Sequence, residues 1–261
     1  MAENATRPAV ALETRGLTRY FGGLAAVSGV SIACEMGRVH AVIGPNGAGK
    51  TTLINLLSGD LPPTSGSVLF DGEDISSLDS AGRSRRGLGR SYQKTNVFLP
   101  FTVFENCRLA AQSRAGSSMR FFRNALADRA VNESAERALI AAGLEGRAGT
   151  VVSMLSHGEQ RQVEIAMALA TRPRVLLLDE PLAGMGAEES AGIVTLLQKL
   201  VADHAILLVE HDMDAVFAVA DTLTVMVNGT VLETGTPETI RASRAVQEAY
   251  LGTEEVVHDA D

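Results

Sequence analysis

The chain of 261 residues has no tryptophan, only two cysteines and no run of 18 or more apolar residues. The missing apolar run argues against a membrane-spanning helix, and the N-terminus lacks the charged-then-apolar pattern of a secretory signal. Cys34 and Cys107 lack metal-ligand spacing, so we expect buried thiols and a reducing compartment. A net charge of −8 argues against a general nucleic-acid-binding protein, because such proteins are usually basic.

Strand-like segments of two kinds are present. Short runs near the N-terminus, the last followed by an Asp71–Gly72 turn, predict antiparallel strands at residues 9–19, 27–35 and 67–71. Continuous apolar runs are typical of buried parallel strands, and they occupy residues 38–44, 174–180 and 205–211. A helical segment at 188–203 separates the last two runs, and residues 221–235 predict a hairpin around Asn228–Gly229.

A glycine-rich loop follows the strand at 38–44 and leads into a helix that we expect to end at Gly59. Its pattern is Gly-x-x-x-x-Gly-Lys-Thr, which is the P-loop pattern in the required strand–loop–helix context. Glycine amides and the helix start can cradle phosphate oxygens, Lys50 can reach the β- and γ-phosphates, and the Thr51 hydroxyl can bind Mg²⁺. The sequence therefore predicts a nucleoside triphosphate as the ligand.

Two adjacent carboxylates, Asp179 and Glu180, end the apolar run that begins at residue 174. The carboxyl ends of such strands are where α/β sheets bind ligands, and neighbouring strand residues point to opposite sides. We therefore assign Asp179 to Mg²⁺, directly or through water, and Glu180 to polarising the attacking water.

Helical patterns replace strand-like runs from about residue 88 to residue 170. One helix before Gly143 places Leu126, Ala130, Leu139 and Ile140 near helical spacing, and another, at 157–172, ends before Pro173. We predict an α/β fold: a P-loop NTPase core with a parallel sheet, an N-terminal antiparallel β subdomain and a helical insert. Residues 1–87 and 171–261 form the nucleotide-binding core, and residues 88–170 form the insert, a signature-bearing subdomain.

The stretch LSHGEQ, beginning at Leu155, resembles the LSGGQ signature of ATP-binding-cassette (ABC) ATPases. Other motifs of that family follow the same order along residues 10–252: Phe21 matches the adenine-stacking aromatic, Gln93 the Q-loop glutamine and His211 the switch histidine. The resemblance implies ATP and Mg²⁺ as ligands and catalysis by Glu180, His211 and Gln93. Magnesium would be bound by Thr51, Gln93 and Asp179. Nucleotide would be bound by Phe21, Gly44, Pro45, Asn46, Gly47, Ala48, Gly49, Lys50, Thr51, Thr52, Ser156 and Gly158.

Ser156 and Gly158 begin a second helix that offers a hydroxyl, amides and a helix dipole to an anion. Because the glycine loop already binds phosphate on its own side, this second site suggests contact with another molecule's nucleotide. In the family, two cassettes pair head-to-tail around two ATP molecules. Three departures from the family pattern are His157, Glu159 and Gly186; Glu159 would repel phosphate if it pointed inward, and we assign Gly186 no role.

Several features resemble the ATPases of branched-chain amino-acid importers, among them FGGLAAV, AGMG and the C-terminal AYLG. We expect a peripheral subunit on the cytoplasmic face of the inner membrane, in a homodimer or heterodimer of ATP-binding subunits with two permeases, served indirectly by a solute-binding protein and without nucleic acid. Alternatives are a urea or short-amide importer, a lipid-exporter ATPase, or a soluble ABC-type regulator.

The segment around Gln93 contains aromatic and leucine side chains that would form either the core of the insert or a groove for a permease helix. They are Tyr92, Phe98, Leu99, Phe101 and Phe104. Four nearby arginines are interpreted as a solvated face, with contact to a partner or to lipid headgroups as the alternative: Arg83, Arg85, Arg86 and Arg90.

Overall fold

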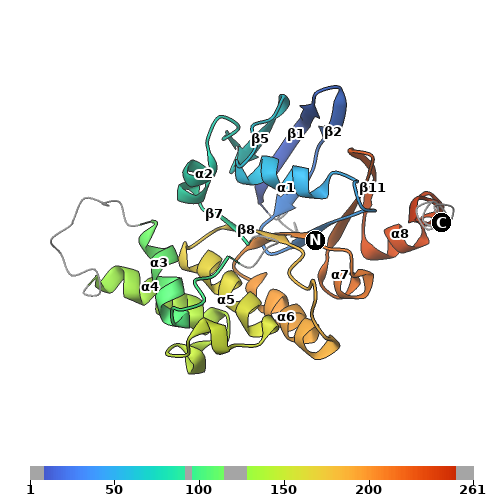
Figure 1. Cartoon of the computed structure of the whole chain (residues 1–261). Helices are drawn as coiled ribbons and strands as arrows, with labels where there is room; N and C mark the ends of the chain where they lie inside the picture. Colours follow the sequence, from blue (N-terminus) through green and yellow to red (C-terminus); the bar gives the residue numbers. More distant parts are fainter. Residues whose placement is uncertain (1–8, 92–95, 115–127, 251–261) are drawn as a thin grey trace, which may run out of the picture.

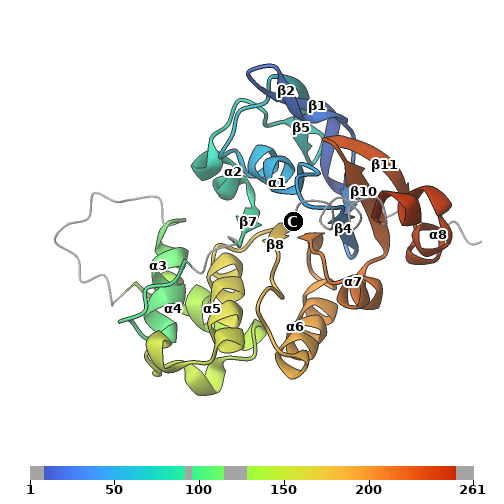
Figure 2. The same cartoon turned by 45° about the vertical axis from the view of Figure 1, so that its right-hand side comes forward.

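The computed structural model describes residues 9–91, 96–114 and 128–250 of the chain. Two β-sheets enclose helix α1 (Lys50–Ser58), and a group of helices lies on the other side of the larger sheet (Figures 1 and 2). Both cysteines are buried and unpaired, as expected from the sequence.

The N-terminal sheet is antiparallel, with strand order β2-β1-β5-β6 and β3 paired to β1. Its strands are β1 (Val10–Phe21), β2 (Leu24–Val30), β3 (Ala33–Glu35), β5 (Ser65–Phe70) and β6 (Glu73–Asp74). The single strand expected at 27–35 is in fact two strands. The buried Thr14 hydroxyl donates to Val30 O and accepts from Ile32 N, both at 3.0 Å, so a side chain replaces the ladder at the break.

The larger sheet has the order β11-β10-β4-β9-β8-β7. Its strands are β4 (Val39–Ile43), β7 (Leu88–Arg90), β8 (Val175–Asp179), β9 (Ala205–Val209), β10 (Thr222–Val227) and β11 (Thr230–Gly235). Every residue of β4, β8 and β9 is buried, which explains their continuous apolar sequences. The pairs from β10 to β7 are parallel, and β10 and β11 form the expected antiparallel hairpin.

Strand β7 contradicts the expectation that strands disappear from residue 88 onward. Leu88, Gly89 and Arg90 pair in parallel with Val175, Leu176 and Leu177 at the edge of the sheet. Three residues, one of them glycine, are too few to produce an alternating pattern, so only the pairing with β8 reveals this strand.

The helices on the far side of the larger sheet include α3 (Val103–Gln112), α4 (Arg129–Ala141) and α5 (His157–Ala170), which pack against one another. Helix α4 ends near Gly143, as predicted, but its buried face differs from the expected one. Ile140 is 63% exposed, whereas Leu139 is buried. The buried face consists of Val131, Ser134, Ala135, Ala138 and Leu139. Leu126 lies outside the described residues.

The remaining helices are α2 (Ser80–Arg86), α6 (Ala187–Leu200), α7 (Met213–Val219) and α8 (Pro237–Ala242). Alternate residues of the larger sheet belong to two hydrophobic clusters. Leu176 and Leu178 pack in the cluster that contains α3 to α6, whereas Val175 and Leu177 pack in the cluster that contains α1 and the N-terminal sheet. Because β4, β8 and β9 are paired in parallel, their carboxyl ends lie at one edge of the sheet, and β4 leads there into the loop before α1.

Candidate functional site

The glycine loop between β4 and α1 has a backbone that other residues would not adopt without strain. Gly47 has φ 78° and Gly49 has φ 99°. A Cβ atom added to Gly49 would lie 2.3 Å from Ala26 O, because the loop is pressed against strand β2. The turn of the β10–β11 hairpin supports the loop from behind, where Gly229 N donates to Ala48 O at 3.0 Å. The loop is therefore fixed by its neighbours.

The start of α1 has no side-chain cap and no acidic residue in its first turn. Lys50 is 7% exposed, and its Nζ donates to Gly44 O at 2.6 Å and to Pro45 O at 3.1 Å. Burial lowers the pKa of the Lys50 ammonium, and the nearby Glu180 and Asp179 carboxylates oppose that change. Thr51 is exposed and Thr52 is half-buried at the helix start. These residues present amides, a cation and a hydroxyl in a form suited to a phosphate group.

Asp179 ends strand β8 and is 1% exposed. Its Oδ2 lies 3.5 Å from Arg90 Nη2, while Oδ1 is buried with no hydrogen-bond partner among the described residues. Burial raises the pKa of the Asp179 carboxyl, although Arg90 acts in the opposite direction. A buried acceptor without a partner fits a divalent cation, and Mg²⁺ usually combines one or two such protein ligands with substrate phosphates.

Glu180 lies where the chain leaves the sheet, with φ 47°, which is unusual for a residue with a side chain. Its amide donates to Val209 O at 2.8 Å. The Arg161 guanidinium donates to Asp179 O at 2.5 Å and to Glu180 O at 3.1 Å. Such a backbone conformation costs about 1–3 kcal/mol and persists only where the surroundings fix it. These contacts fix the backbone that carries the two adjacent carboxylates.

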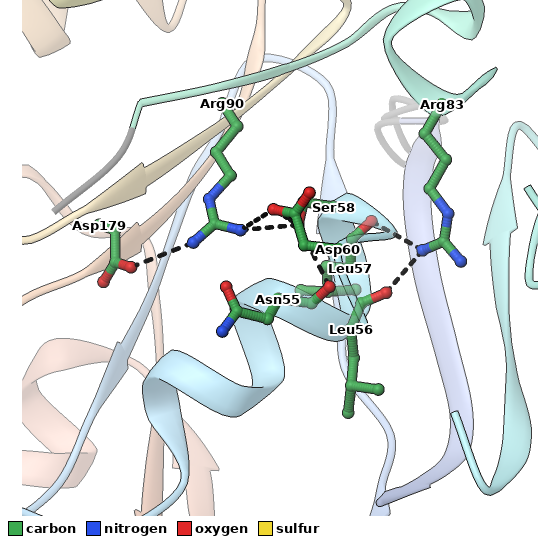
Figure 3. Close-up of polar contacts among 8 residues, drawn as sticks. All are labelled: Asn55, Leu56, Leu57, Ser58, Asp60, Arg83, Arg90 and Asp179. Atoms are coloured by element: carbon green, nitrogen blue, oxygen red, sulfur yellow. Dashed lines mark hydrogen bonds and ion pairs between the residues drawn. The ribbon is translucent and has the colours of Figure 1, made fainter. Parts of the chain in front are cut away.

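Arg90, the last residue of strand β7, contacts two carboxylates, Asp179 at the end of β8 and Asp60 after α1 (Figure 3). Its Nη1 donates to Ser58 Oγ at 2.7 Å and to Asp60 Oδ2 at 2.6 Å, at the end of α1. Arg83 is fully buried and donates to the last-turn carbonyls Leu56 O and Leu57 O, at 2.6 and 2.8 Å. The interpretation of the arginines as a solvated face is therefore wrong for Arg83 and Arg90. Arg85 and Arg86 are exposed.

His211 follows β9 and is largely exposed, with Nδ1 3.7 Å from Glu210 Oε2. Glu210 is fully buried; its carboxylate accepts from Leu182 N at 2.7 Å and from His211 N at 3.1 Å. Burial raises the pKa of the Glu210 carboxyl. No motif in the sequence pointed to this residue. Through these hydrogen bonds Glu210 joins the end of β9 to the segment that follows Glu180. Gln93 lies outside the described residues.

Phe21 is at the end of β1 and is 47% exposed, with the Arg19 guanidinium 5.0 Å from its ring centre. Near α3, the side chains of Phe98, Leu99 and Phe101 are 52%, 46% and 41% exposed, so they are not core residues. Phe98 and Phe101 stack with ring centres 5.5 Å apart. Phe104 is partly buried against the core, and Tyr92 lies outside the described residues.

The start of α5 is capped, unlike the start of α1. The Ser156 hydroxyl accepts from Glu159 N at 3.2 Å, and Glu159 Oε2 accepts from Ser156 N at 3.0 Å, which is a complete capping box. Glu159 also lies 3.0 Å from Arg147 Nε, so its carboxylate is committed to the cap and this ion pair. Gly158 N donates to Glu189 Oε1 of helix α6 at 3.1 Å. His157 Nε2 lies 3.3 Å from Ala183 O.

Apart from Phe21 at the end of β1 and Gln93, which lies outside the described residues, the predicted site residues form two groups: the glycine loop with the β8 and β9 ends, and the start of α5. Within the described part of the chain, no helix is long and apolar enough to cross a membrane. Nor do the described residues include three or more His, Cys, Asp or Glu side chains grouped as metal ligands.

Comparisons with known proteins agree with this geometry. Residues 27–183 match the family model described as ABC transporter, and residues 230–256 match the model described as branched-chain amino acid ATP-binding cassette transporter. The chain is 40% identical to the high-affinity branched-chain amino acid transport ATP-binding protein BraF of Pseudomonas aeruginosa, over 92% of this chain and 97% of the relative.

Two solved structures are also similar. One is the ADP conformation of an ATP-binding cassette of an ABC transporter, with a TM-score of 0.83 and 30% identity, covering 93% of this chain and 99% of that one. The other is a dimeric bacterial ABC transporter cassette, with a TM-score of 0.72 and 25% identity, covering 87% of this chain and 98% of that one.

Proposed function

The chain belongs to the ABC transporter family of ATP-binding cassettes, and we propose that it is the ATP-hydrolysing subunit of an importer for branched-chain or related amino acids. The observation that carries the choice of solute is the 40% identity to BraF over nearly its whole length. The separate match of residues 230–256 to a branched-chain amino acid cassette model supports it.

ATP would bind with its phosphates in the glycine loop and its adenine against Phe21. Backbone amides of the loop and the Lys50 ammonium would contact the phosphates, and the Lys50 ammonium already lies at the loop, where its Nζ donates to Gly44 O. Magnesium would be held by Thr51, Gln93 and Asp179, and when bound it would neutralise charge on the phosphates. The buried Oδ1 of Asp179 supports this assignment, since it has no hydrogen-bond partner among the described residues.

Hydrolysis would depend on Glu180, Gln93 and His211. Glu180 would polarise a water molecule for attack on the γ-phosphate, and the contacts to its backbone support a fixed position for this group. His211 would contact the γ-phosphate, and the buried Glu210 beneath it would fix its backbone. Together these residues would hold the γ-phosphate and polarise the attacking water, and none of them would form a covalent bond to ATP.

Two cassettes would pair around two ATP molecules. Ser156 and Gly158 would receive the γ-phosphate held by the other cassette, which would be a copy of this chain or a close relative. The similarity to a dimeric cassette supports this arrangement. Because ATP would contact both cassettes only in the paired state, it would shift the population toward pairing, and hydrolysis would reverse that shift.

The membrane partners would be two permease subunits, with the chain bound peripherally at the cytoplasmic face of the inner membrane and a solute-binding protein acting on the opposite side. The exposed Phe98, Leu99 and Phe101 would meet a permease segment. We further propose that residues 88–170 act as the signature-bearing subdomain on the nucleotide-binding core formed by residues 1–87 and 171–261.

The test is ATP hydrolysis by the chain in membranes that contain its two permease partners. We expect a solute-binding protein loaded with leucine, isoleucine or valine to stimulate hydrolysis. Stimulation by a urea-loaded or short-amide-loaded protein instead would assign the chain to that alternative. Stimulation by lipid alone would identify an exporter, and full activity without permeases would contradict the proposal.

A further inference from the structure

The start of α5 already holds an anion that belongs to the same chain. Glu189, in the first turn of α6, accepts a hydrogen bond from Gly158 N at 3.1 Å. The Gly158 amide, and after it the Ser156 hydroxyl, hold the pKa of the Glu189 carboxyl below its usual value. These are the two donors that were expected to receive phosphate. The Glu189 carboxylate therefore occupies that position.

The fit between Gly158 and Glu189 is close. A Cβ atom added to Gly158 would lie 2.9 Å from Glu189 Oε1 and 3.1 Å from Glu189 Cβ, so the absence of a side chain at residue 158 admits the carboxylate. Glu159 is nearer in sequence, but it bonds to Ser156 N and Arg147 and leaves the Gly158 amide to Glu189.

A phosphate and a carboxylate cannot share these donors. Both are negatively charged, and at hydrogen-bond distance from the same amide they would repel each other strongly. The carboxylate therefore has to rotate away before a phosphate can bind, and Glu189 is only partly buried, which leaves room for that rotation.

We propose that Glu189 is an internal competitor that occupies the signature site of the unpaired chain and has to leave before two cassettes can close on ATP. This inference rests on the proposed pairing around ATP. Moving the Glu189 carboxylate away from Gly158 N would cost free energy, which would disfavour pairing of the cassettes. Unproductive ATP hydrolysis away from the permeases would thereby be reduced.

The principal experiment measures pairing in the Glu180→Gln background, in which ATP is bound but not consumed. Light scattering would follow the association of the chain as MgATP is titrated, with and without Glu189→Ala. A hydrogen bond to a charged group is of the size that changes an equilibrium constant by about tenfold. We expect Glu189→Ala to lower the ATP concentration at half-pairing by about tenfold, and Glu189→Gln to lower it less.

The matched control is Glu188→Ala, which removes the same charge from the same helix turn at an exposed position. We expect this variant to pair like the parent. Pairing unchanged by Glu189→Ala would overturn the proposal, and weaker pairing would show that Glu189 supports the closed state instead.

A second measurement does not depend on pairing. In the nucleotide-free wild-type chain, the amide resonance of Gly158 should move on Glu189→Gln and stay in place on Glu188→Gln. An unmoved Gly158 resonance would contradict occupation of the site by Glu189. A parent that never pairs with MgATP would instead contradict the proposed function, and the resonance would still decide whether Glu189 occupies the site.

Discussion

The starts of helices α1 and α5 are both expected to bind phosphate, yet they are prepared for it in opposite ways. Helix α1 begins without a side-chain cap or an acidic residue, and its Lys50 Nζ donates to the neutral carbonyls of Gly44 and Pro45. Helix α5 begins with a complete capping box and a second carboxylate from α6. The difference suggests that the first site accepts ATP directly, whereas the second becomes available only after an internal anion leaves.

The largest expected effect concerns the uncapped site at α1. Lys50→Ala should lower ATP hydrolysis by about 10²-fold or more, because a preorganised charge aimed at the phosphates is lost. It should also weaken nucleotide binding, measured by equilibrium titration with ATP. Lys199→Ala is the control, since Lys199 is exposed in the last turn of α6. Hydrolysis by the Lys50→Ala variant at the wild-type rate would contradict the binding of the ATP phosphates at the start of α1.

The next largest effect concerns substitutions of the two helix-start glycines, Gly49 and Gly158, which should lower the stability of the chain by different amounts. Gly49→Ala places a Cβ atom 2.3 Å from a backbone oxygen at φ 99°, so we expect a loss of about 3 kcal/mol in the free energy of unfolding. Gly158→Ala meets the movable Glu189 side chain and should cost less than about 1 kcal/mol. Urea unfolding of the nucleotide-free variants checks both values. Equal losses would mean that the two starts are equally constrained.

The caps provide a smaller test. Ser156→Ala and Thr102→Ala each remove the N-cap of a capping box, at α5 and α3, and each should cost about 1 kcal/mol of stability. In the Glu180→Gln background, only Ser156→Ala should also change the ATP concentration needed for pairing. The same change in both variants would show that the pairing effect comes from stability alone.

The carboxylates beside the two helix starts should respond to pH with opposite signs. The folded-state pKa of Asp179 is raised, so its ionisation destabilises the folded chain at neutral pH. Asp179→Asn should therefore be more stable than wild type at pH 7, and the difference should vanish as pH falls below the ordinary aspartate pKa.

For Glu189 the folded-state pKa is lowered, so its ionisation stabilises the chain above the ordinary glutamate pKa. Glu189→Gln should be slightly less stable than wild type at pH 7, and the difference should vanish as pH falls through the lowered pKa. Melting temperatures measured from neutral pH down to well below the ordinary pKa values of aspartate and glutamate would check both variants. Differences of the same sign would contradict the contrast between the two sites.

The sequence predicted the parts of the fold that local patterns encode. The continuous apolar strands, the hairpin at Asn228–Gly229 and the glycine loop are all present in the structure. Strand β7 was missed because its three residues carry no periodic signal, and the division into β2 and β3 depends on the Thr14 hydroxyl, a residue of another strand.

The polar contacts around the site were not predictable in the same way. Arg90 meets Asp179, which is 89 residues away, and Glu189 meets Gly158, which is 31 residues away. Only the fold brings these pairs together. For the same reason the prediction of a solvated face failed for Arg83 and Arg90, because their buried partners are distant in sequence. The roles of all the site residues, Glu180, Gln93 and His211 among them, are predictions that depend on the resemblance to the family.

The most direct test of the whole account is the composition of the ATP-locked complex. Native mass spectrometry of the Glu180→Gln chain, purified with its permeases in MgATP, should find two ATP-binding subunits and two ATP molecules in each complex. A complex that holds one such subunit with its ATP fully bound would contradict the claim that each nucleotide lies between the start of α1 in one cassette and the start of α5 in the other.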